Sequence, residues 1–199
     1  MAAAERLEAN ETRDVRTSVQ DGVLLVQFSR PERRNPLSSV VLKKLDEIVE
    51  NIEPDIERVI FTGESDVFAS GADLNEIDSL TEENAAAFAR RGQALMSRIE
   101  RLEALTIAAI NGFCFGGALD LALACTRRVA SPHASFAHPG AGLGIITGWG
   151  GTQRLPRLIG TANALEMFFT ASPIDANRAA AIGLADQIAD DPARAARSI

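Results

Sequence analysis

One charged side chain interrupts an otherwise apolar run, NGFCFGGALDLALAC, which spans residues 111–125. It is Asp120, which lies three residues after the second glycine of the pair Gly116 and Gly117. Charged side chains are rarely buried unless a partner neutralises them or a reaction uses them. An acid in the first turn of a helix also interacts favourably with the helix dipole. Asp120 is therefore either a helix-stabilising acid or a candidate acid/base group, and its position alone leaves both interpretations open.

Two glycine-flanked turns share a pattern that suits the binding of an oxygen atom. FASGADLNE places residues 69–73 in a tight turn before a helix, and FCFGGALD does the same with Gly116 and Gly117. Small residues let a ligand approach the backbone, and the first N–H groups of a helix lack partners within it. If the two turns face each other, they form an oxyanion hole, in which one donor contributes about 3–4 kcal/mol. The alternative is two ordinary helix starts.

Composition and charge exclude several classes of function. The chain has 199 residues and a net charge of −7, which disfavours nucleic acid as a partner, although a phosphate-bearing small molecule remains compatible. Cys114 and Cys125 lie in the apolar run and are expected to be small buried thiols. His133 and His138 are too isolated for a convincing metal pair, so ordinary polar or surface histidines are the favoured interpretation.

The elements that must position these turns alternate between strands and helices. Hydrophobic spacing, glycines and caps predict a hairpin around Asp21 and Gly22, and a helix that begins at Ser38 or Ser39. Ser79 and Glu82 predict a capping box before a long helix that ends near residue 102. Further strands are expected at 58–63, 106–110 and 127–131, and helices at 116–125, 152–160 and 164–171. This alternation indicates an α/β layered fold with crossover connections.

Six segments then occur in a characteristic order. PERRNPLS, VFASGADLNE, NGFCFGGALDLALAC, FAHPGAGLGI, GWGGTQRLPRLIG and AIGLAD together resemble the crotonase superfamily, the enoyl-CoA hydratase/isomerase fold, from about residue 15 to 188. The resemblance implies a stacked ββα superhelix in a single crotonase-like domain, residues 15–199. The closing segment DDPARAARSI suggests a shortened C-terminal helical region. Residues 1–14 are expected to form a mobile N-terminal arm.

The resemblance also implies an activity and its residues. The expected protein is an acyl-CoA thioester enzyme that works through an oxyanion-stabilised enolate, most simply an enoyl-CoA hydratase, a lyase of fatty-acid metabolism. Coenzyme A is then part of the substrate, and no further cofactor or metal is expected. A homotrimer or hexamer is also implied. A cytoplasmic protein without a membrane partner is expected from the residues themselves, because the N-terminus is acidic without an apolar core and polar residues break the run 105–125. By motif, Ala72 and Gly117 donate the N–H groups and Asp120 is the acid/base. The thioester end is lined by Ala72, Asp73, Leu74 and Asn75, and Arg33 and Arg34 meet the adenine and phosphates unless they are simply solvated.

The sequence departs from the family at two positions. Gly140, in FAHPG, stands where the second family glutamate is expected, and Asp120 is one methylene shorter than the first. One carboxylate suffices for a proton shuttle, whereas the addition of water usually needs a second group. The alternatives to a hydratase are therefore an enoyl-CoA isomerase, a non-catalytic acyl-CoA binding protein, or a decarboxylase or hydrolase of acyl-CoA. His138 is a conceivable substitute, but nothing in the sequence directs its ring toward the site.

Overall fold

The computed structural model describes residues 13–199, so the first twelve residues of the expected N-terminal arm lie outside the described residues. The two remaining residues of that arm are bonded to the folded chain. The backbone carbonyl of Asp14 accepts from Ser29 N at 3.0 Å, and its carboxylate accepts from Arg30 Nη1 at 3.0 Å. The Arg13 carbonyl accepts from the Ser29 hydroxyl at 3.2 Å. The described part of the arm is therefore attached beside the end of the second strand.

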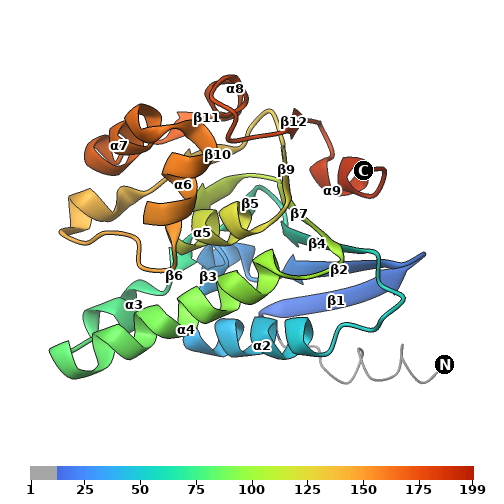
Figure 1. Cartoon of the computed structure of the whole chain (residues 1–199), viewed down its shortest axis with the longest axis horizontal. Helices are drawn as coiled ribbons and strands as arrows, with labels where there is room; N and C mark the ends of the chain where they lie inside the picture. Colours follow the sequence, from blue (N-terminus) through green and yellow to red (C-terminus); the bar gives the residue numbers. More distant parts are fainter. Residues whose placement is uncertain (1–12) are drawn as a thin grey trace.

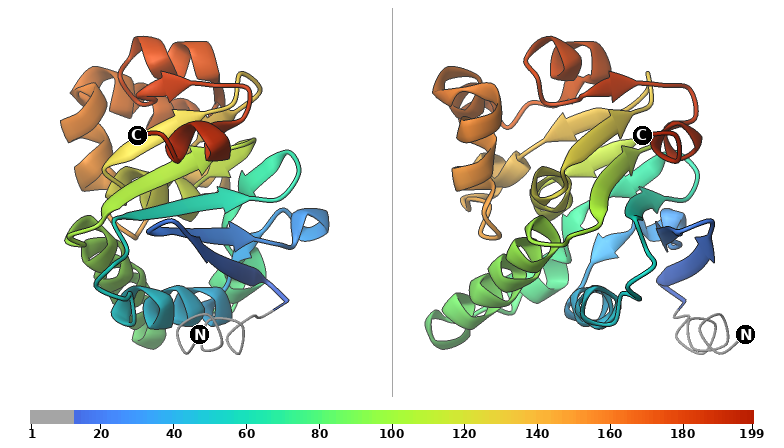
Figure 2. Two further views of the ribbon diagram at one scale, coloured as in Figure 1. Left: turned by 90° about the vertical axis from the view of Figure 1, so that its right-hand side faces the viewer. Right: turned by 45° about the vertical axis from the view of Figure 1, so that its right-hand side comes forward.

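A six-stranded sheet forms the main layer (Figure 2). Its order is β1 (Val15–Gln20), β2 (Val23–Phe28), β4 (Arg58–Gly63), β7 (Leu105–Ile110), β9 (Arg127–Ala130) and β12 (Gln187–Ile188). The first two strands are antiparallel and the others pair in parallel. Asp21 and Gly22 have φ values of 50° and 72°, as a two-residue hairpin turn requires. The predicted hairpin is confirmed.

A second layer of short strands repeats the same pattern. The strands β11 (Ile174–Asp175), β10 (Ser135–Ala137), β8 (Phe113–Phe115) and β5 (Val67–Ala69) form one sheet, and β3 (Pro36–Leu37) pairs with β6 (Gly71–Ala72). Three times in succession, a strand of the large sheet is followed by a strand of the second sheet: β4 then β5, β7 then β8, and β9 then β10. Helices follow these pairs. This confirms the stacked ββα arrangement that the resemblance implies.

Helices cover the strands on their outer side and between the layers (Figure 1). They are α2 (Ser39–Glu50), α3 (Leu74–Asp78), α4 (Glu82–Glu100), α5 (Gly117–Ala124), α6 (Gly151–Ile159), α7 (Thr161–Thr170), α8 (Ala176–Ala181) and α9 (Pro192–Ala196), with 3-10 turns η1 (Pro31–Arg33) and η2 (Pro139–Leu143). The predicted cap of the helix α2 is confirmed, because the Ser38 hydroxyl accepts from Val41 N at 3.3 Å.

The predicted start of the long helix α4 is wrong. Residues 74–78 form the separate helix α3, and Ser79 ends it, with its hydroxyl donating to the Glu76 carbonyl at 2.7 Å. The cap of α4 is instead Thr81, whose backbone N–H donates to Asn84 Oδ1 at 2.8 Å. A short helix immediately before a long one thus shifts the capping residue by two positions.

The helix α5 lies at the centre of the core. All its residues from Ala118 to Ala124 are buried, which explains why the run is apolar on every face. Cys114 and Cys125 are buried free thiols, as expected, and burial raises the pKa of Cys125 to about 12. Within residues 13–199, no helix is long and apolar enough to cross a membrane.

Candidate functional site

Three turns meet at one edge of the second sheet. The strands β5, β8 and β10 are parallel, so their carboxyl ends lie side by side. Phe115 pairs with Ala137, and Gly116 N donates to the Ala137 carbonyl at 2.9 Å. The residues that follow the strands are therefore neighbours: Ser70–Ala72 after β5, Gly116 and Gly117 after β8, and His138 after β10.

The two glycine-flanked turns are in direct contact, which is the arrangement that an oxyanion hole requires. A Cβ atom on Gly71 would lie 2.6 Å from the Phe115 carbonyl oxygen and 2.8 Å from Gly117 N. Gly71 also has a φ of +92°, which side chains rarely allow. Glycine therefore lets the strand β6 pack against the N-terminus of α5. Ala72 and Gly117 lie next to each other as a result.

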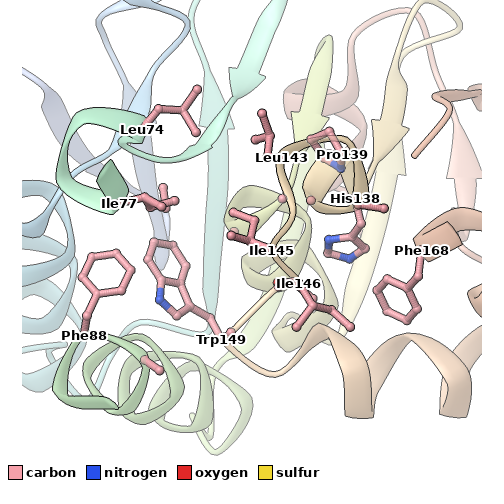
Figure 3. A pocket seen from close by; sticks show the side chains of 18 of the residues that line it. Leu74, Ile77, Phe88, His138, Pro139, Leu143, Ile145, Ile146, Trp149 and Phe168 are labelled. Atoms are coloured by element: carbon pink, nitrogen blue, oxygen red, sulfur yellow. The ribbon is translucent and has the colours of Figure 1, made fainter. Parts of the chain in front are cut away.

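A pocket of about 470 Å³ opens at this edge (Figure 3). Ala72 and Gly117 line it together with apolar side chains from α3, α4, α7 and the loop after β10. Ile77 and Phe88 lie on one side of it, and Ile146 and Phe168 on the other. Gly117 is the first residue of α5, so its N–H has no acceptor within the helix. An apolar pocket with few polar groups suits an aliphatic chain with one polar end.

Asp120 is fully buried beside this pocket, with 0% of its surface exposed. Its Oδ2 accepts hydrogen bonds from the Thr147 hydroxyl and from Trp149 N, the latter at 3.1 Å. Burial raises the pKa of the carboxyl to about 6, although these two bonds favour its ionised form. Among the described residues that line the pocket, Asp120 is absent. The expected acid/base group therefore lies behind the pocket wall, because Thr147 and Trp149 cover it.

His138 lies in the pocket wall, with 2% of its surface exposed. Its Nε2 is 3.7 Å from Asp120 Oδ1, and the ring packs on Phe168 with centroids 5.1 Å apart. Within residues 13–199, neither ring nitrogen nor Asp120 Oδ1 has a hydrogen-bond partner. Burial lowers the pKa of His138 to about 4, so the imidazole is neutral at neutral pH. The interpretation of His138 as an ordinary polar or surface residue missed this placement.

A signal for His138 was present in the sequence. FAHP and FCFG each contain a phenylalanine at the second-layer strand, followed by the turn that reaches the site. Once β8 and β10 are known to be parallel neighbours in register, the residues after them must share one edge. The sequence alone does not supply that register, because it depends on the pairing of strands 20 residues or more apart.

The loop after β10 occupies the place of the missing glutamate. A Cβ atom on Gly140 would lie 2.6 Å from the Ile145 carbonyl oxygen, and Ile145 N donates to the Gly140 carbonyl at 3.0 Å. At the other end of this loop, a Cβ atom on Gly151 would overlap Asp120 Oδ1. The glycine-rich segment 138–151 is thus folded closely around Asp120 and His138.

The other residues predicted for the thioester end have local roles. Asp73 caps α3, since its Oδ1 accepts from Asn75 N at 2.9 Å and from Asn75 Nδ2 at 3.1 Å. Leu74 is largely exposed and lines the pocket. The structure thus brings Ala72 and Leu74 to the pocket, whereas Asp73 and Asn75 bond to each other. Among residues 13–199, no three metal-binding side chains gather in one place.

The two arginines predicted to meet coenzyme A lie on an exposed loop outside the pocket. Arg34 places its guanidinium carbon 5.8 Å from the centre of the Phe113 ring, and Arg33 ends η1. The loop is fixed by Asn35, whose amide donates to the carbonyls of Val67 and Phe68 at 3.0 and 3.1 Å. Both arginines are thereby held beside β5, the strand that leads into the Ala72 turn.

Comparisons with known proteins agree with this architecture. The family model described as enoyl-CoA hydratase/isomerase matches residues 18–195. The short-chain-enoyl-CoA hydratase of Clostridium acetobutylicum is 40% identical, over 84% of this chain and 66% of that protein. The crotonyl-CoA hydratase of Syntrophomonas wolfei is 38% identical, over 85% of this chain and 66% of that protein. The chain thus spans just under two thirds of the length of these curated relatives.

Solved structures share the fold. Pseudomonas aeruginosa DspI superposes with a TM-score of 0.90 at 32% identity, over 94% of this chain and 79% of that one. A Thermobifida fusca protein solved in complex with CoA gives a TM-score of 0.85 at 29% identity, over 98% of this chain and 79% of that one. With the ββα layers, the paired turns and the family match over nearly its whole length, the chain belongs to the enoyl-CoA hydratase/isomerase family.

Proposed function

We propose that this protein is an acyl-CoA enzyme of the enoyl-CoA hydratase type. One observation carries the proposal: Ala72 and Gly117 lie side by side at the wall of an apolar pocket. Their N–H groups would hold the thioester oxygen while the acyl chain occupies the pocket. As an enolate develops, negative charge gathers on that oxygen, and each backbone donor is typically worth a factor of about 10²–10³ in rate. The two hydratases that this chain resembles support the same reaction class.

The test is the hydration of a 2-enoyl-CoA. Crotonyl-CoA and longer trans-2-enoyl-CoAs are incubated with the protein, and loss of the conjugated thioester absorbance is followed. We expect turnover that falls in Asp120→Ala, because the buried carboxylate supports the site from behind. Deuterium incorporation at the α-carbon of a saturated acyl-CoA in deuterated water reports enolate formation separately. The absence of both reactions, in protein that is folded, would refute the proposed activity.

We also propose that Arg33 and Arg34 bind the phosphates of coenzyme A. The loop is held beside β5 by Asn35, and both side chains are exposed, with Arg34 over the ring of Phe113. Arg33→Ala and Arg34→Ala together should weaken CoA binding about tenfold, or about 1.4 kcal/mol, with a loss of salt dependence. Arg101→Ala, an exposed arginine at the end of α4, is the matched control. Equal affinities measured by calorimetry for all variants would show that the loop is simply solvated.

A homotrimer, or a hexamer built from two, is the assembly that we propose. Large apolar side chains near the pocket are exposed in the single chain, with Ile146 at 65% and Phe169 at 77%. Contiguous exposed apolar surface usually marks a contact with another molecule. Light scattering coupled to size exclusion should give a mass of three or six chains. A monomer at micromolar concentration would contradict the assembly but not the activity.

A further inference from the structure

We propose that His138 is the catalytic acid/base of this site, and that Asp120 is a positioning residue that acts through His138. The inference rests on the proposed acyl-CoA function and deepens it. It exchanges the roles that the sequence motif suggested, because the motif places the acid/base at residue 120.

Access to the pocket separates the two residues. Among the described residues that line the pocket, His138 is the only one with an acid/base side chain. It follows β10 directly, and Gly116 N, one residue before the Gly117 donor, is bonded to Ala137, one residue before His138. The imidazole therefore lies in the pocket wall, near a proposed oxyanion donor. Asp120 has no exposed surface and does not line the pocket.

Buried polar atoms without hydrogen-bond partners indicate that the His138 ring can bond to a further group. Leaving a buried polar atom without a hydrogen bond typically costs about 1–3 kcal/mol. Here both nitrogens of a ring that is 2% exposed lack a partner within residues 13–199, as does Asp120 Oδ1. The 3.7 Å between Nε2 and Oδ1 is longer than the usual hydrogen bond, and such catalytic pairs often tighten only when substrate binds.

The surroundings of Asp120 suit an orienting carboxylate. Its Oδ2 is held by the Thr147 hydroxyl and Trp149 N, and Gly151 leaves room for Oδ1. Oδ1 lies 3.7 Å from His138 Nε2, and the backbone N–H of Gly151 helps to favour the ionised carboxylate. A carboxylate in this position favours the tautomer with its proton on Nε2, which leaves Nδ1 as the proton acceptor. The face of the ring rests on Phe168, which restricts its rotation (Figure 3).

The proton transfer balances within these groups. His138 Nδ1 takes the α-proton of the acyl-CoA, and the electron pair of the broken C–H bond forms the enolate. The negative charge moves to the thioester oxygen, at the N–H groups of Ala72 and Gly117. The positive charge on the imidazolium is balanced by the Asp120 carboxylate. In the reverse step the ring returns a proton to carbon, so in deuterated water the α-position gains deuterium without net reaction.

The experiment measures α-proton exchange and binding in matched variants. His138→Gln should lower the exchange rate by at least 100-fold, the usual size of a general acid/base effect, while acyl-CoA affinity measured by calorimetry changes less than threefold. His133→Gln, in the exposed turn before β10, changes the only other histidine and should match the wild type. Asp120→Asn should lower exchange about tenfold. His138→Phe, which preserves apolar packing on Phe168, is the second variant should the glutamine fail to fold.

Nuclear magnetic resonance of the histidine rings tests this inference separately from the proposed function. The ¹⁵N shifts of the two imidazoles, assigned with the two glutamine variants, need no substrate. We expect His138 as the Nε2–H tautomer in the wild type and an altered pattern in Asp120→Asn. An unchanged pattern would overturn the pairing, and wild-type exchange in His138→Gln and His138→Phe would overturn the catalytic role. Failure of the wild type to bind or exchange any acyl-CoA would instead refute the proposed function, while the ¹⁵N result would still decide the pairing.

Discussion

The buried carboxylate of Asp120 should make the stability of the protein depend on pH in a defined way. Burial raises its pKa from an ordinary value of 3.8 to about 6. Each pKa unit corresponds to about 1.36 kcal/mol, so the ionised form costs the folded state about 3 kcal/mol relative to the protonated form. The pKa of Asp120 is higher in the folded protein than in the unfolded chain, so protonation of Asp120 stabilises the folded state. This stabilisation is complete below pH 3.8. It is lost as the pH rises through 6.

Asp120→Asn in a His138→Gln background isolates this effect. Asparagine carries no charge at any pH, and its carbonyl oxygen still accepts from Thr147 and Trp149. Removing His138 removes the titrating group nearest to the carboxylate. The other ionisable groups that influence it are Arg154 and Cys114, and both are present in the two proteins compared. A difference in hydrogen bonding between the two proteins adds a constant that does not change with pH.

The expected result is a free-energy difference that grows with pH. Between pH 4.5 and pH 8, the asparagine variant should gain about 2 kcal/mol over its aspartate counterpart, since part of the total of about 3 kcal/mol is already expressed at pH 4.5. Urea unfolding of both proteins at pH 4.5, 6 and 8 measures it. A difference that stays constant within about 0.5 kcal/mol would mean that water reaches Asp120, and would refute the closed arrangement around it.

Two further predictions concern the glycines of the loop. Gly140→Glu, which restores the second family glutamate, should destabilise the protein by about 1–3 kcal/mol and give no gain in hydration, because its Cβ would press on the Ile145 carbonyl. Gly142→Glu is the control, since a Cβ there meets nothing within 4 Å; a large gain of hydration in Gly140→Glu alone would contradict the prediction. Gly151→Ala should displace the Asp120 carboxylate and lower α-proton exchange, and unchanged exchange and thermal stability would show that the carboxylate is not held there.

Much of the fold could be predicted because its signals are local. Asp21 and Gly22 specify a hairpin through their backbone conformation, and Ser38 caps α2 through its hydroxyl. The start of α4 was misplaced because Ser79 and Thr81 are both good caps. The choice between them depends on α3, a helix of five residues too short to show a periodic pattern. Local chemistry thus predicts an element well when one residue decides it.

The candidate site was predictable only in its backbone. The two turns can be recognised from their own glycines and small residues. In the structure, Ala72 and Gly117 lie together at the pocket. The side chains behind them depend on contacts between distant segments. Thr147 covers Asp120 from 27 residues away, a contact that no spacing rule predicts. The resemblance therefore indicated which two turns meet at the pocket, whereas the side-chain contacts behind them depend on three-dimensional packing.

The absence of a glutamate at position 140 is better explained by a rebuilt site than by simple loss. Loss of a long side chain alone would leave a cavity where the carboxylate had been. Instead, the backbone of Ile145 lies against Gly140, and its N–H closes a hydrogen bond to the Gly140 carbonyl. The same loop supplies Thr147, which bonds Asp120, and it begins at His138, whose ring lines the pocket. Because these adjustments all converge on one carboxylate and one imidazole, a functional pair explains them more economically than the decay of an older one.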